Sequence, residues 1–497
     1  MSRPRLRPHM QSLIRCYATA SANASAQGLR GPRRPKKEGT IADVFTLLTS
    51  EEPLLPERFA ALKKEIVTDP QALVHSWHGV LKELENAEQE IQVEKSTNVS
   101  FADIQNGLSE EQLKEIKRAG VIVVRGGVSA EEALSWKQSI REYIQVNSKH
   151  GVKGVPPDRP AFYEIYNSPA QIQARTHPAV IETQKYLLTL WKASSGTPIS
   201  MRTPVSYFDR LRIRPPGPSV FTLGPHIDGG SVERWEDPGF RKCFRKILDG
   251  GDKWTEHDPF DATPRLNANR DLYNAPNQCS IFRPWQGWTS LSSTRAGEGT
   301  LRVLPFLNLS TAYVMLRPFF RLRDGAYGTS VSSTAVPLDA GAWELDLDSP
   351  AFPGSLPRKA QQMRPETHPH LRLDKLVVSI PNVEPGDQVY WHCDLIHAVE
   401  AEHNGAGDSS VLYIPAVPLT QDNAAYLRDQ LQNFEAGIPP PDFPGGIGEA
   451  HFTHRGTSAS INSVAARRIL GLEPFDVPPD ADEGEKDLIQ SVNAALF

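Results

Sequence analysis

The architecture of this 497-residue chain is clearest in two segments, Leu223–Gly230 (LGPHIDGG) and Pro385–His397 (PGDQVYWHCDLIH). In the first, His226 and Asp228 would point to the same face of an extended strand, because side chains alternate along a strand. The second opens with a Pro-Gly-Asp turn and then predicts a strand that carries histidines near its end. We expect the two segments to lie side by side, although 169 residues separate Asp228 from His397.

Around these segments the chain consists of short apolar strands separated by proline and glycine turns. The predicted strands are Leu211–Arg214, Leu301–Leu304, Leu376–Ile380, Gln388–Trp391 and Val411–Val417. Many short strands with such turns favour a sandwich or a jelly roll, and a jelly roll returns a late strand beside an early one. The sequence therefore predicts a mainly β fold with flanking helices and a jelly-roll core.

Helices are predicted on both sides of the strands. Apolar residues at three- and four-residue spacing predict helices over 41–48, 56–67 and 73–95. Ser109 is expected to open a short helix that ends near Gly120, and Ser129 with Glu132 forms a capping box for a helix that runs to about residue 146. A last helix is predicted over 423–435 and is closed by a glycine.

These patterns divide the chain into four segments. They are a basic presequence expected to be disordered (1–37), an N-terminal helical arm (38–100), a β domain (101–435) and a Pro/Gly-rich C-terminal arm (436–497). No run approaches the roughly 18 uncharged apolar residues that a membrane-spanning helix needs, so no membrane span is expected.

The charge of the chain is unevenly spread. Residues 1–37 carry nine Lys or Arg and no acid, which leaves 45 basic against 59 acidic residues, a net charge near −14, in the rest. A body of that charge does not attract phosphate backbones, so nucleic-acid binding is not expected. The basic start is rich in Arg, Ser and Ala, and Arg15–Ser21 resembles a mitochondrial processing site. We expect import into the mitochondrial matrix, with a disordered basic tail on a cytoplasmic protein as the alternative.

His226 and Asp228 have the chemistry of a metal site. An imidazole and a carboxylate side by side are two of the three ligands of the 2-His-1-carboxylate triad that holds non-haem Fe(II). Three ligands on one face leave adjacent positions open for a co-substrate and oxygen. Taken alone, an H-x-D pair is also common in surface turns, and the chain contains a second one at His392 and Asp394.

The joint pattern resembles a known superfamily. Four segments carry it: PHIDGGSVERW (225–235), FRPWQGWTSLSSTRAGEGTLRVLP (282–305), PGDQVYWHCDLIHAVE (385–400) and SSVLYIPAVPLT (409–420). From about residue 100 to 450 the chain resembles Fe(II)/2-oxoglutarate-dependent oxygenases, in particular the phytanoyl-CoA dioxygenase-like group. It looks most like the uncharacterised YbiU-like family of bacteria and fungi.

The resemblance implies a fold, a site and an activity. It implies a double-stranded β-helix in which His226, Asp228 and a distal histidine bind Fe(II). It further implies a dioxygenase, most simply a hydroxylase, that uses 2-oxoglutarate and O2 to oxidise a small-molecule substrate and releases succinate and CO2. The sequence carries no signal for the identity of that substrate or for the oligomeric state.

Two histidines compete for the distal position. The family's ligand follows the Gly-Asp turn by ten to eleven residues, and His397 lies eleven residues after Gly386. His392 on the same predicted strand is the alternative, with support of the metal or co-substrate as its other possible role. Asp394 is expected to be a turn or supporting acid rather than a ligand.

The chain departs from the family at the co-substrate anchor. In the phytanoyl-type pattern an Arg about eleven residues after the distal histidine binds the C5 carboxylate of 2-oxoglutarate through two parallel hydrogen bonds. That position falls in Gly407–Ser410, where there is no Arg. Arg212, Arg214 and Arg302 are the candidate replacements, and each could equally be a surface ion-pair partner.

This departure keeps two other functions open. One is a jelly-roll binding or scaffold protein that has lost turnover, and the other is a hydrolase that binds zinc at the same residues. Three further groups have both a functional and a packing interpretation. Trp285, Gln286 and Trp288 could line a substrate pocket, Glu233–Trp235 could form a lid, and His368 with His370 has the spacing of metal ligands, although Pro369 argues against a regular strand there.

Overall fold

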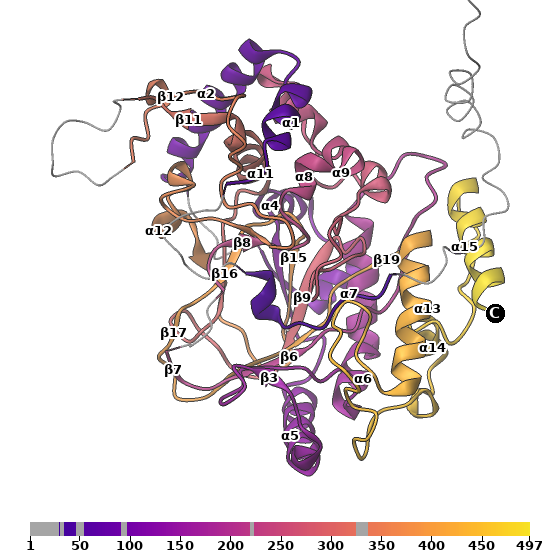
Figure 1. Cartoon of the computed structure of the whole chain (residues 1–497). Coiled ribbons are helices and arrows are strands. Elements are labelled where there is room, and N and C mark those ends of the chain that lie inside the picture. Colours follow the sequence, from indigo (N-terminus) through magenta and orange to yellow (C-terminus); the bar gives the residue numbers. More distant parts are fainter. Residues whose placement is uncertain (1–28, 30–33, 46–53, 91–96, 219–222, 325–335) are drawn as a thin grey trace, which may run out of the picture.

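The structure, a computed structural model, describes residues 29, 34–45, 54–90, 97–218, 223–324 and 336–497. Strands gather in the middle of the molecule, and helices pack above, below and to the right of them in the view of Figure 1. Within the described ranges, helical residues outnumber strand residues. The fold is therefore a mixture of helices and sheets, which corrects the mainly β composition that the turn pattern predicted.

The larger sheet has eight strands. In spatial order they are β1 (Asn98–Ser100), β2 (Val121–Arg125), β15 (Gln388–His392), β9 (Trp285–Ser290), β18 (Ser409–Tyr413), β6 (Leu211–Arg214), β4 (Phe162–Tyr163) and β3 (Gly154–Val155). All neighbouring pairs are antiparallel except β1 and β2, which are parallel. The order places strands from the middle and the end of the chain next to each other.

The smaller sheet has five strands and contains parts of the two segments 223–230 and 385–397. Its order is β13 (Gln361–Gln362), β8 (His226–Ile227), β16 (His397–Val399), β10 (Leu301–Val303) and β14 (Val378–Ser379), and every neighbouring pair is antiparallel. Three two-stranded ribbons complete the strands: β11 (Phe320–Leu322) with β12 (Trp343–Leu345), β7 (Gly217–Pro218) with β17 (Glu402–His403), and β5 (Ser200–Pro204) with β19 (Pro418–Leu419).

The predicted strands are largely present. β6, β10 and β15 fall where the sequence placed them, and β18 begins two residues earlier than predicted and ends at Tyr413. The window 376–380 is divided between the end of a helical turn, α12 (Leu373–Leu376), and the short strand β14. Short apolar windows do not distinguish a strand from a buried helical turn, which explains this error.

The N-terminal arm is helical, as predicted, with shifted ends. It contains a 3-10 turn at Ile41–Val44, α1 (Arg58–Ile66) and α2 (Pro70–Ala87). α2 begins earlier than predicted because the Asp69 carboxylate accepts hydrogen bonds from the first free amides and Pro70 occupies the first turn. Residues 46–48 and 91–95 of the predicted helices lie outside the described residues.

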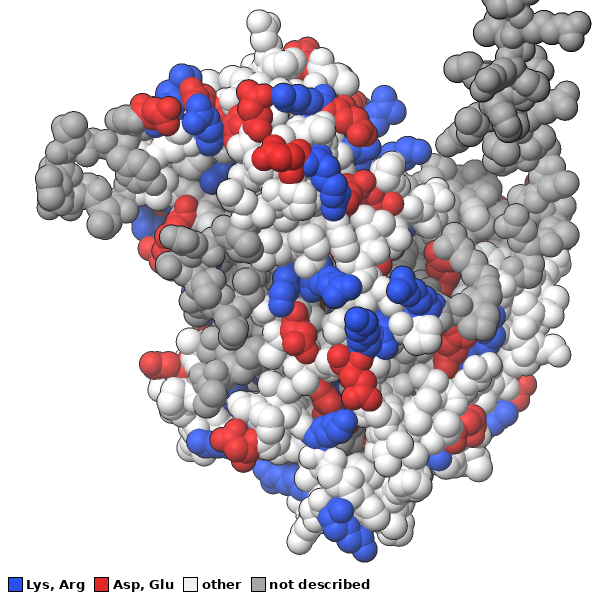
Figure 2. Space-filling view, viewed as in Figure 1, with Lys and Arg blue, Asp and Glu red and all other residues white. Residues whose placement is uncertain are grey.

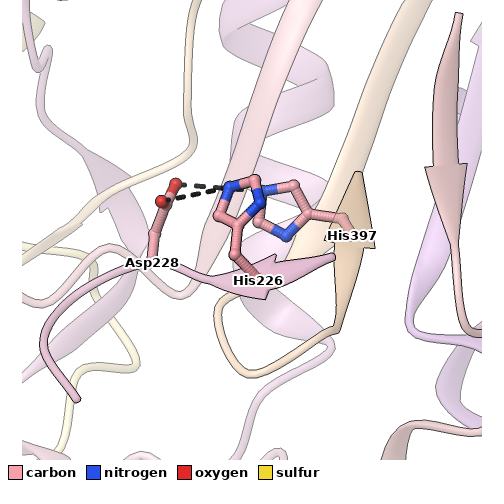
Figure 3. Close-up of side chains that lie close together, drawn as sticks. All are labelled: His226, Asp228 and His397. Carbon is pink, nitrogen blue, oxygen red and sulfur yellow. Dashed lines mark ion pairs between the residues drawn. The ribbon is translucent and has the colours of Figure 1, made fainter. Parts of the chain in front are cut away.

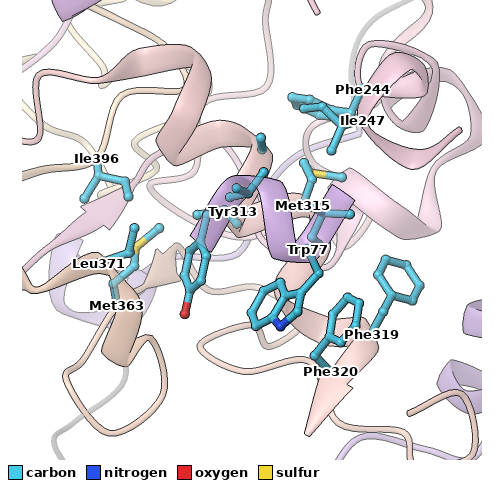
Figure 4. Close-up of a cluster of buried hydrophobic side chains, with 14 of the residues drawn as sticks. Trp77, Phe244, Ile247, Tyr313, Met315, Phe319, Phe320, Met363, Leu371 and Ile396 are labelled. Atoms are coloured by element: carbon cyan, nitrogen blue, oxygen red, sulfur yellow. The ribbon is translucent and has the colours of Figure 1, made fainter. Parts of the chain in front are cut away.

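A cluster of aromatic and aliphatic side chains fixes this arm to the body (Figure 4). Trp77 of α2 is fully buried and stacks on Phe320, with ring centroids 4.4 Å apart, and on Tyr313, 5.5 Å away. Tyr313 belongs to α11 (Leu307–Leu316), which is buried on nearly all sides. Because α11 is apolar all round, it has no helical periodicity, and the sequence analysis missed it.

The remaining helices surround the two sheets. They are α3 (Phe101–Asn106), α4 (Glu110–Ala119), α5 (Ala130–Val146), α6 (Pro169–Arg175), α7 (Pro178–Thr189), α8 (Glu233–Glu236), α9 (Pro238–Lys242), α10 (Arg245–Leu248), α13 (Gln421–Ala436), α14 (Val464–Ile469) and α15 (Glu483–Leu496). The capping box predicted at Ser129 is present, Ser109 caps α4 at the predicted start of that helix, and Gly120 ends α4 in the left-handed conformation.

The C-terminal segment is more ordered than its composition suggested. It contains α14 and α15, which lie beside α13 at the right of Figure 1. Leu488, Ile489 and Val492 of α15 are buried in a cluster shared with α13 and β19. The segment from 436 onward therefore packs onto the body over much of its length.

The predicted presequence falls mostly outside the described residues, and mitochondrial import stays a prediction. Lys36, at its end, belongs to the folded body. The Lys36 Nζ lies 2.7 Å from an oxygen of Asp271 and 3.1 Å from an oxygen of Asp442, and the lysine side chain is only 4% exposed.

In the described part of the chain, no helix is both long enough and apolar enough to cross a membrane. On the face shown in Figure 2, acidic and basic side chains are interspersed. That face shows no separate basic patch of the kind that binds nucleic acid.

Candidate metal centre

Three side chains from the two expected segments meet at two adjacent inner strands of the smaller sheet, β8 and β16 (Figure 3). His226 of β8 pairs directly with His397 of β16, and Asp228 follows β8. The Asp228 carboxylate oxygens lie 3.5 Å from Nε2 of His226 and 3.9 Å from Nε2 of His397. One ligand atom from each residue can be chosen so that all three lie within 4.8 Å of one another.

The main chain holds both imidazoles in one orientation. Nδ1 of His226 lies 2.7 Å from the carbonyl oxygen of Gly224, and Nδ1 of His397 lies 3.0 Å from that of Leu395. A carbonyl only accepts, so each Nδ1 carries the proton and donates it. The Nε2 lone pair of each ring is then free and directed toward Asp228, which is the arrangement that metal-bound histidines adopt.

The turn after Asp228 needs glycine. Gly229 and Gly230 both have positive φ, 78° and 87°, a region that favours glycine. A Cβ on Gly230 would also lie 2.7 Å from the carbonyl oxygen of Arg270. The double glycine therefore lets the chain turn sharply away from the sheet directly after the carboxylate.

The protonation states fit metal binding. Burial, with the neighbouring His226 as a further cause, lowers the pKa of His397 to about 3, so this imidazole is neutral at physiological pH. Burial alone would raise the pKa of Asp228, but the adjacent histidines and Arg283 outweigh it and lower that pKa. Neutral imidazoles and an ionised carboxylate are the forms that bind a divalent cation.

His392 and Asp394 point elsewhere. The ring of His392 stacks on Trp191 with centroids 4.7 Å apart, its Nε2 donates to the carbonyl of Pro259, and its Nδ1 accepts from the amide of Asp394. The Asp394 carboxylate pairs with the buried Arg265 at 2.5 Å. His392, Cys393 and Asp394 lie close enough to form a ligand group, but burial raises the pKa of the Cys393 thiol to about 12 and both nitrogens of His392 are already used.

A cavity opens directly in front of the three residues and extends between the sheets. Gln286 and Trp288 of β9 line it, as one of their two interpretations expected, and so does Tyr413 of β18. Trp285 does not line it: this side chain is fully buried and its indole donates to the carbonyl of Leu187, which is the packing interpretation. The N-terminal segment contributes Ile41, Val44 and Phe45, which no sequence signal had indicated. The Phe45 ring meets the His226 ring edge-on, with centroids 4.9 Å apart.

The three candidate anchors for 2-oxoglutarate occupy different environments. Arg212 of β6 lines the cavity, and one of its terminal nitrogens donates to the carbonyl of Gly299 and the hydroxyl of Ser409 while its buried Nε has no partner among the described residues. Arg214 donates to two main-chain carbonyls in the loop 400–401, and Arg302 donates to the carbonyl of Val377. Neither of these two lines the cavity.

Two further arginines line the cavity and were missed from the sequence. Arg283 lies 3.6 Å from the Asp228 carboxylate and 3.4 Å from that of Asp209, and Arg210 also pairs with Asp209. Neither arginine sits in a periodic pattern, because both lie beside strand ends rather than within strands. A basic residue in a short turn carries no local signal of this kind.

The remaining sequence candidates are buried side chains. Glu233, Arg234 and Trp235 are buried in α8, and the Trp235 indole donates to the carbonyl of Met315, so this turn anchors rather than covers. His368 and His370 are buried beside the Trp77 cluster, and among the described residues they do not form a group of three potential metal ligands with any other side chain.

Comparison with known proteins assigns the chain to a family. The model of the Gig2-like family matches residues 52–472. The chain belongs to the Gig2-like family. The resemblance to YbiU-like proteins is confirmed, because this Gig2-like chain is 34% identical over 387 residues to the uncharacterised protein YbiU of Escherichia coli K12, covering 76% of this chain and 85% of YbiU.

Solved structures give the same assignment. The GlcNAc-inducible Gig2 protein of Candida albicans is 31% identical, with a TM-score of 0.78 over 90% of this chain and 96% of the other. A candidate oxidoreductase from Salmonella typhimurium LT2 is 29% identical, with a TM-score of 0.67 over 85% and 99% of the two chains. A 2-oxoglutarate-dependent carbocyclase, SnoK, has a TM-score of only 0.32 at 13% identity, a similarity too low to support any conclusion about this Gig2-like chain.

Proposed function

We propose that this Gig2-like protein is an Fe(II)- and 2-oxoglutarate-dependent oxygenase, most simply a hydroxylase, with His226, Asp228 and His397 as its iron ligands. The observation that carries the proposal is the convergence of two Nε2 lone pairs and one ionised carboxylate beside a cavity. Two imidazoles and one carboxylate with open positions are characteristic of non-haem iron oxygenases.

The arrangement of the sheets supports this proposal. The smaller sheet carries His226 on β8 and His397 on β16, with Asp228 directly after β8, and the larger sheet supplies cavity walls through β6, β9 and β18. We propose that these two sheets are the two halves of a double-stranded β-helix. Such a core explains how ligands separated by 169 residues become neighbours.

Each cavity residue has a role that its position allows. Bound Fe(II) with 2-oxoglutarate and O2 would supply the oxidation of a substrate C–H bond, with release of succinate and CO2. Arg212 is the proposed anchor of the 2-oxoglutarate C5 carboxylate, because a guanidinium with a free edge matches a carboxylate. Phe45, Trp288 and Trp391 line the space around the ligands and limit the access of water to it.

Anaerobic addition of Fe(II) and 2-oxoglutarate tests the proposal. The intact protein should develop a weak visible charge-transfer band, and His226→Ala should not. An exposed-histidine variant, His75→Ala, is the control and should keep the band. Absence of the band from intact, folded protein that binds iron would contradict the proposal.

Two measurements separate the alternatives. An oxygenase consumes O2 and forms succinate from 2-oxoglutarate, whereas a zinc hydrolase consumes no O2. A scaffold protein would bind the metal and form no succinate with any substrate-containing extract. The observation that favours turnover over a purely structural role is the cavity directly beside the ligands, since it gives a substrate room next to the metal.

A further inference from the structure

A side chamber adjoins the metal cavity. The main cavity and the chamber share Asp228, Gly229, Cys279, Arg283 and Gln286 as lining residues. Beyond these, the chamber is lined by a second group that the proposed reaction has not used: Arg234, Arg265, Arg270, Cys393 and Asp394. The chamber is therefore a recess of the same site, reached past the carboxylate ligand.

Positive charge dominates this recess. Four guanidinium groups, those of Arg234, Arg265, Arg270 and Arg283, line it, against the two carboxylates of Asp228 and Asp394. Two acids lie outside the lining: Asp209, which Arg283 shares with Arg210, and Glu233, which interacts electrostatically with Arg234. The thiols add no negative charge, because burial raises the pKa of both cysteines in the lining. A metal ion on Asp228 would increase the excess. Buried charge without a counter-charge is unfavourable, so such an excess points to an anion that belongs there.

Two of the arginines form no ion pair with a carboxylate among the described residues. Arg234 is 2% exposed and donates to the carbonyl oxygens of Gly230 and, at 3.0 Å, of Asp228. Arg270 is 9% exposed and donates to the carbonyls of Ala268 and Arg265, at 3.2 and 2.8 Å. Carbonyls fix the direction of a guanidinium but do not neutralise it.

Aromatic rings keep these groups in place. The guanidinium of Arg270 lies 4.9 Å from the centre of the Phe282 ring, and that of Arg234 lies 5.5 Å from the Phe240 ring. Arg265 spends one terminal nitrogen on Asp394, and its buried Nε has no partner among the described residues. Each guanidinium has five N–H donors, so the recess holds unused donors that are oriented before any ligand arrives.

We propose that this chamber binds an oxyanion group, a carboxylate or a phosphate, carried by the substrate. That the anion belongs to a substrate rests on the proposed oxygenase function, whereas the binding of an anion rests on the arginines alone. Arg212, the proposed anchor of 2-oxoglutarate, does not line the chamber, so two anionic groups have separate binding positions. Because the chamber touches Asp228, the oxidised carbon would lie close to the substrate's anionic group.

Titration of the full-length chain with inorganic phosphate and with acetate, at constant ionic strength, tests the chamber. Wild-type protein should gain thermal stability saturably with at least one of the two, and the tighter of them identifies the oxyanion class. Arg270→Gln should weaken that binding at least about tenfold, since a charge-assisted contact is lost. Arg245→Gln, on the exposed face of α10, is the matched control and should bind as wild type does.

A second variant changes the affinity in the opposite direction. Asp394→Asn removes one of the two carboxylates from the chamber and should tighten oxyanion binding. If Arg270→Gln does not fold, the titrations of Asp394→Asn and of wild-type protein still test the proposal. No saturable effect of either anion on wild-type protein, or equal binding by wild type and folded Arg270→Gln, would overturn the proposal.

Competition separates the substrate from the co-substrate. 2-Oxoglutarate should bind to the anaerobic Fe(II) protein with unchanged affinity when the preferred anion is saturating, and Arg270→Gln should keep its charge-transfer band. Competition between the two would overturn the assignment of the chamber to the substrate. A protein that binds phosphate or acetate in the chamber but gives no band with 2-oxoglutarate would retain the chamber and refute the oxygenase.

Discussion

His226 and His397 hold their rings in the same way: each Nδ1 donates its proton to the carbonyl of the residue two positions earlier in the chain, Gly224 and Leu395. The two rings then face each other across one β8–β16 pair, with centroids 4.1 Å apart. This equivalence arises because each histidine follows a turn, and the turn places the carbonyl of the residue two positions earlier next to the imidazole ring. It presents both Nε2 atoms to one point beside Asp228.

Loss of His397 should abolish metal binding, whereas loss of His392 should not. His397→Ala removes one of three ligands, and the loss of even a supporting partner of a ligand lowers metal affinity about 10- to 100-fold. We expect His397→Ala to lose more than that. His392→Ala should keep stoichiometric metal and lower the melting temperature, because His392 stacks on Trp191 in the core. Metal content and thermal unfolding of both variants check this, and metal-free His392→Ala would reverse the assignment.

Arg212 should control the affinity for 2-oxoglutarate. Arg212→Gln should raise the dissociation constant about 10- to 100-fold, as expected for a lost bidentate contact of about 1.5–3 kcal/mol. Iron affinity should stay unchanged, because Arg212 touches none of the three ligands. Titration of the charge-transfer band measures both constants. Arg302→Gln is the control, since Arg302 does not line the cavity, and equal effects of the two variants would refute the anchor.

Buried histidines should make the protein sensitive to acid. Burial lowers the pKa of His370 to about 3, so the unfolded chain, with an ordinary pKa near 6.5, takes up the proton first as the pH falls. Stability is therefore lost between about pH 6.5 and about pH 3, by about 2 kcal/mol for this one group at pH 5.

His370→Phe should remove that part of the pH dependence. The difference in unfolding free energy between pH 7.5 and pH 5 should shrink by about 2 kcal/mol, measured by urea denaturation. His78→Phe changes an exposed histidine on α2 and should leave the difference as it is. Parallel pH profiles of the unfolding free energy for wild type and His370→Phe would contradict this prediction, because they would mean that the pKa of His370 is the same in the folded and the unfolded chain.

Lys36 should hold the segment 34–45 over the metal cavity. Its ammonium lies between two carboxylates, so Lys36→Ala leaves Asp271 and Asp442 without that cation in a buried position. The start of the segment should then loosen, because the contacts that remain there, such as the hydrogen bond from the Asn274 amide to the carbonyl of Pro35, carry no charge. Limited trypsin digestion should cleave Lys36→Ala faster after Lys37, and Arg34→Ala, which changes an exposed neighbour and keeps that cleavage site, should be as resistant as wild type. Equal digestion of the two variants would contradict this role.

Trp77 should attach the N-terminal helices to the body. Trp77→Ala should lower the unfolding free energy by about 3–5 kcal/mol, the range for removing a large aromatic ring from a core. Glu85→Ala, on the exposed face of the same helix, should change it by less than about 0.5 kcal/mol. Urea unfolding at pH 7.5 measures both, and a small effect of Trp77→Ala would mean that the arm is held elsewhere.

Local interactions were readable in the order of the residues. Ser109 and Ser129 cap helices because their hydroxyls reach amides three positions ahead, and His226 with Asp228 share a face because strands alternate. Each of these features depends on neighbours a few positions apart. The same holds for β6 and β15, whose apolar patterns are contained within a few residues.

Contacts between distant segments required the folded chain. His397 and His392 lie five positions apart in the same sequence segment. Only the positions of Trp191 and Pro259 in the fold show that the ring of His392 is already stacked and hydrogen-bonded. Arg212 is distinguished from Arg214 and Arg302 by which guanidinium lines the cavity. The arginines of the side chamber come from helix α8 (Arg234), a 3-10 helix at Thr263–Asn267 (Arg265) and two loop positions (Arg270 and Arg283). Their charge becomes chemically meaningful only when packing excludes water from all of them at once, and no local pattern encodes that exclusion.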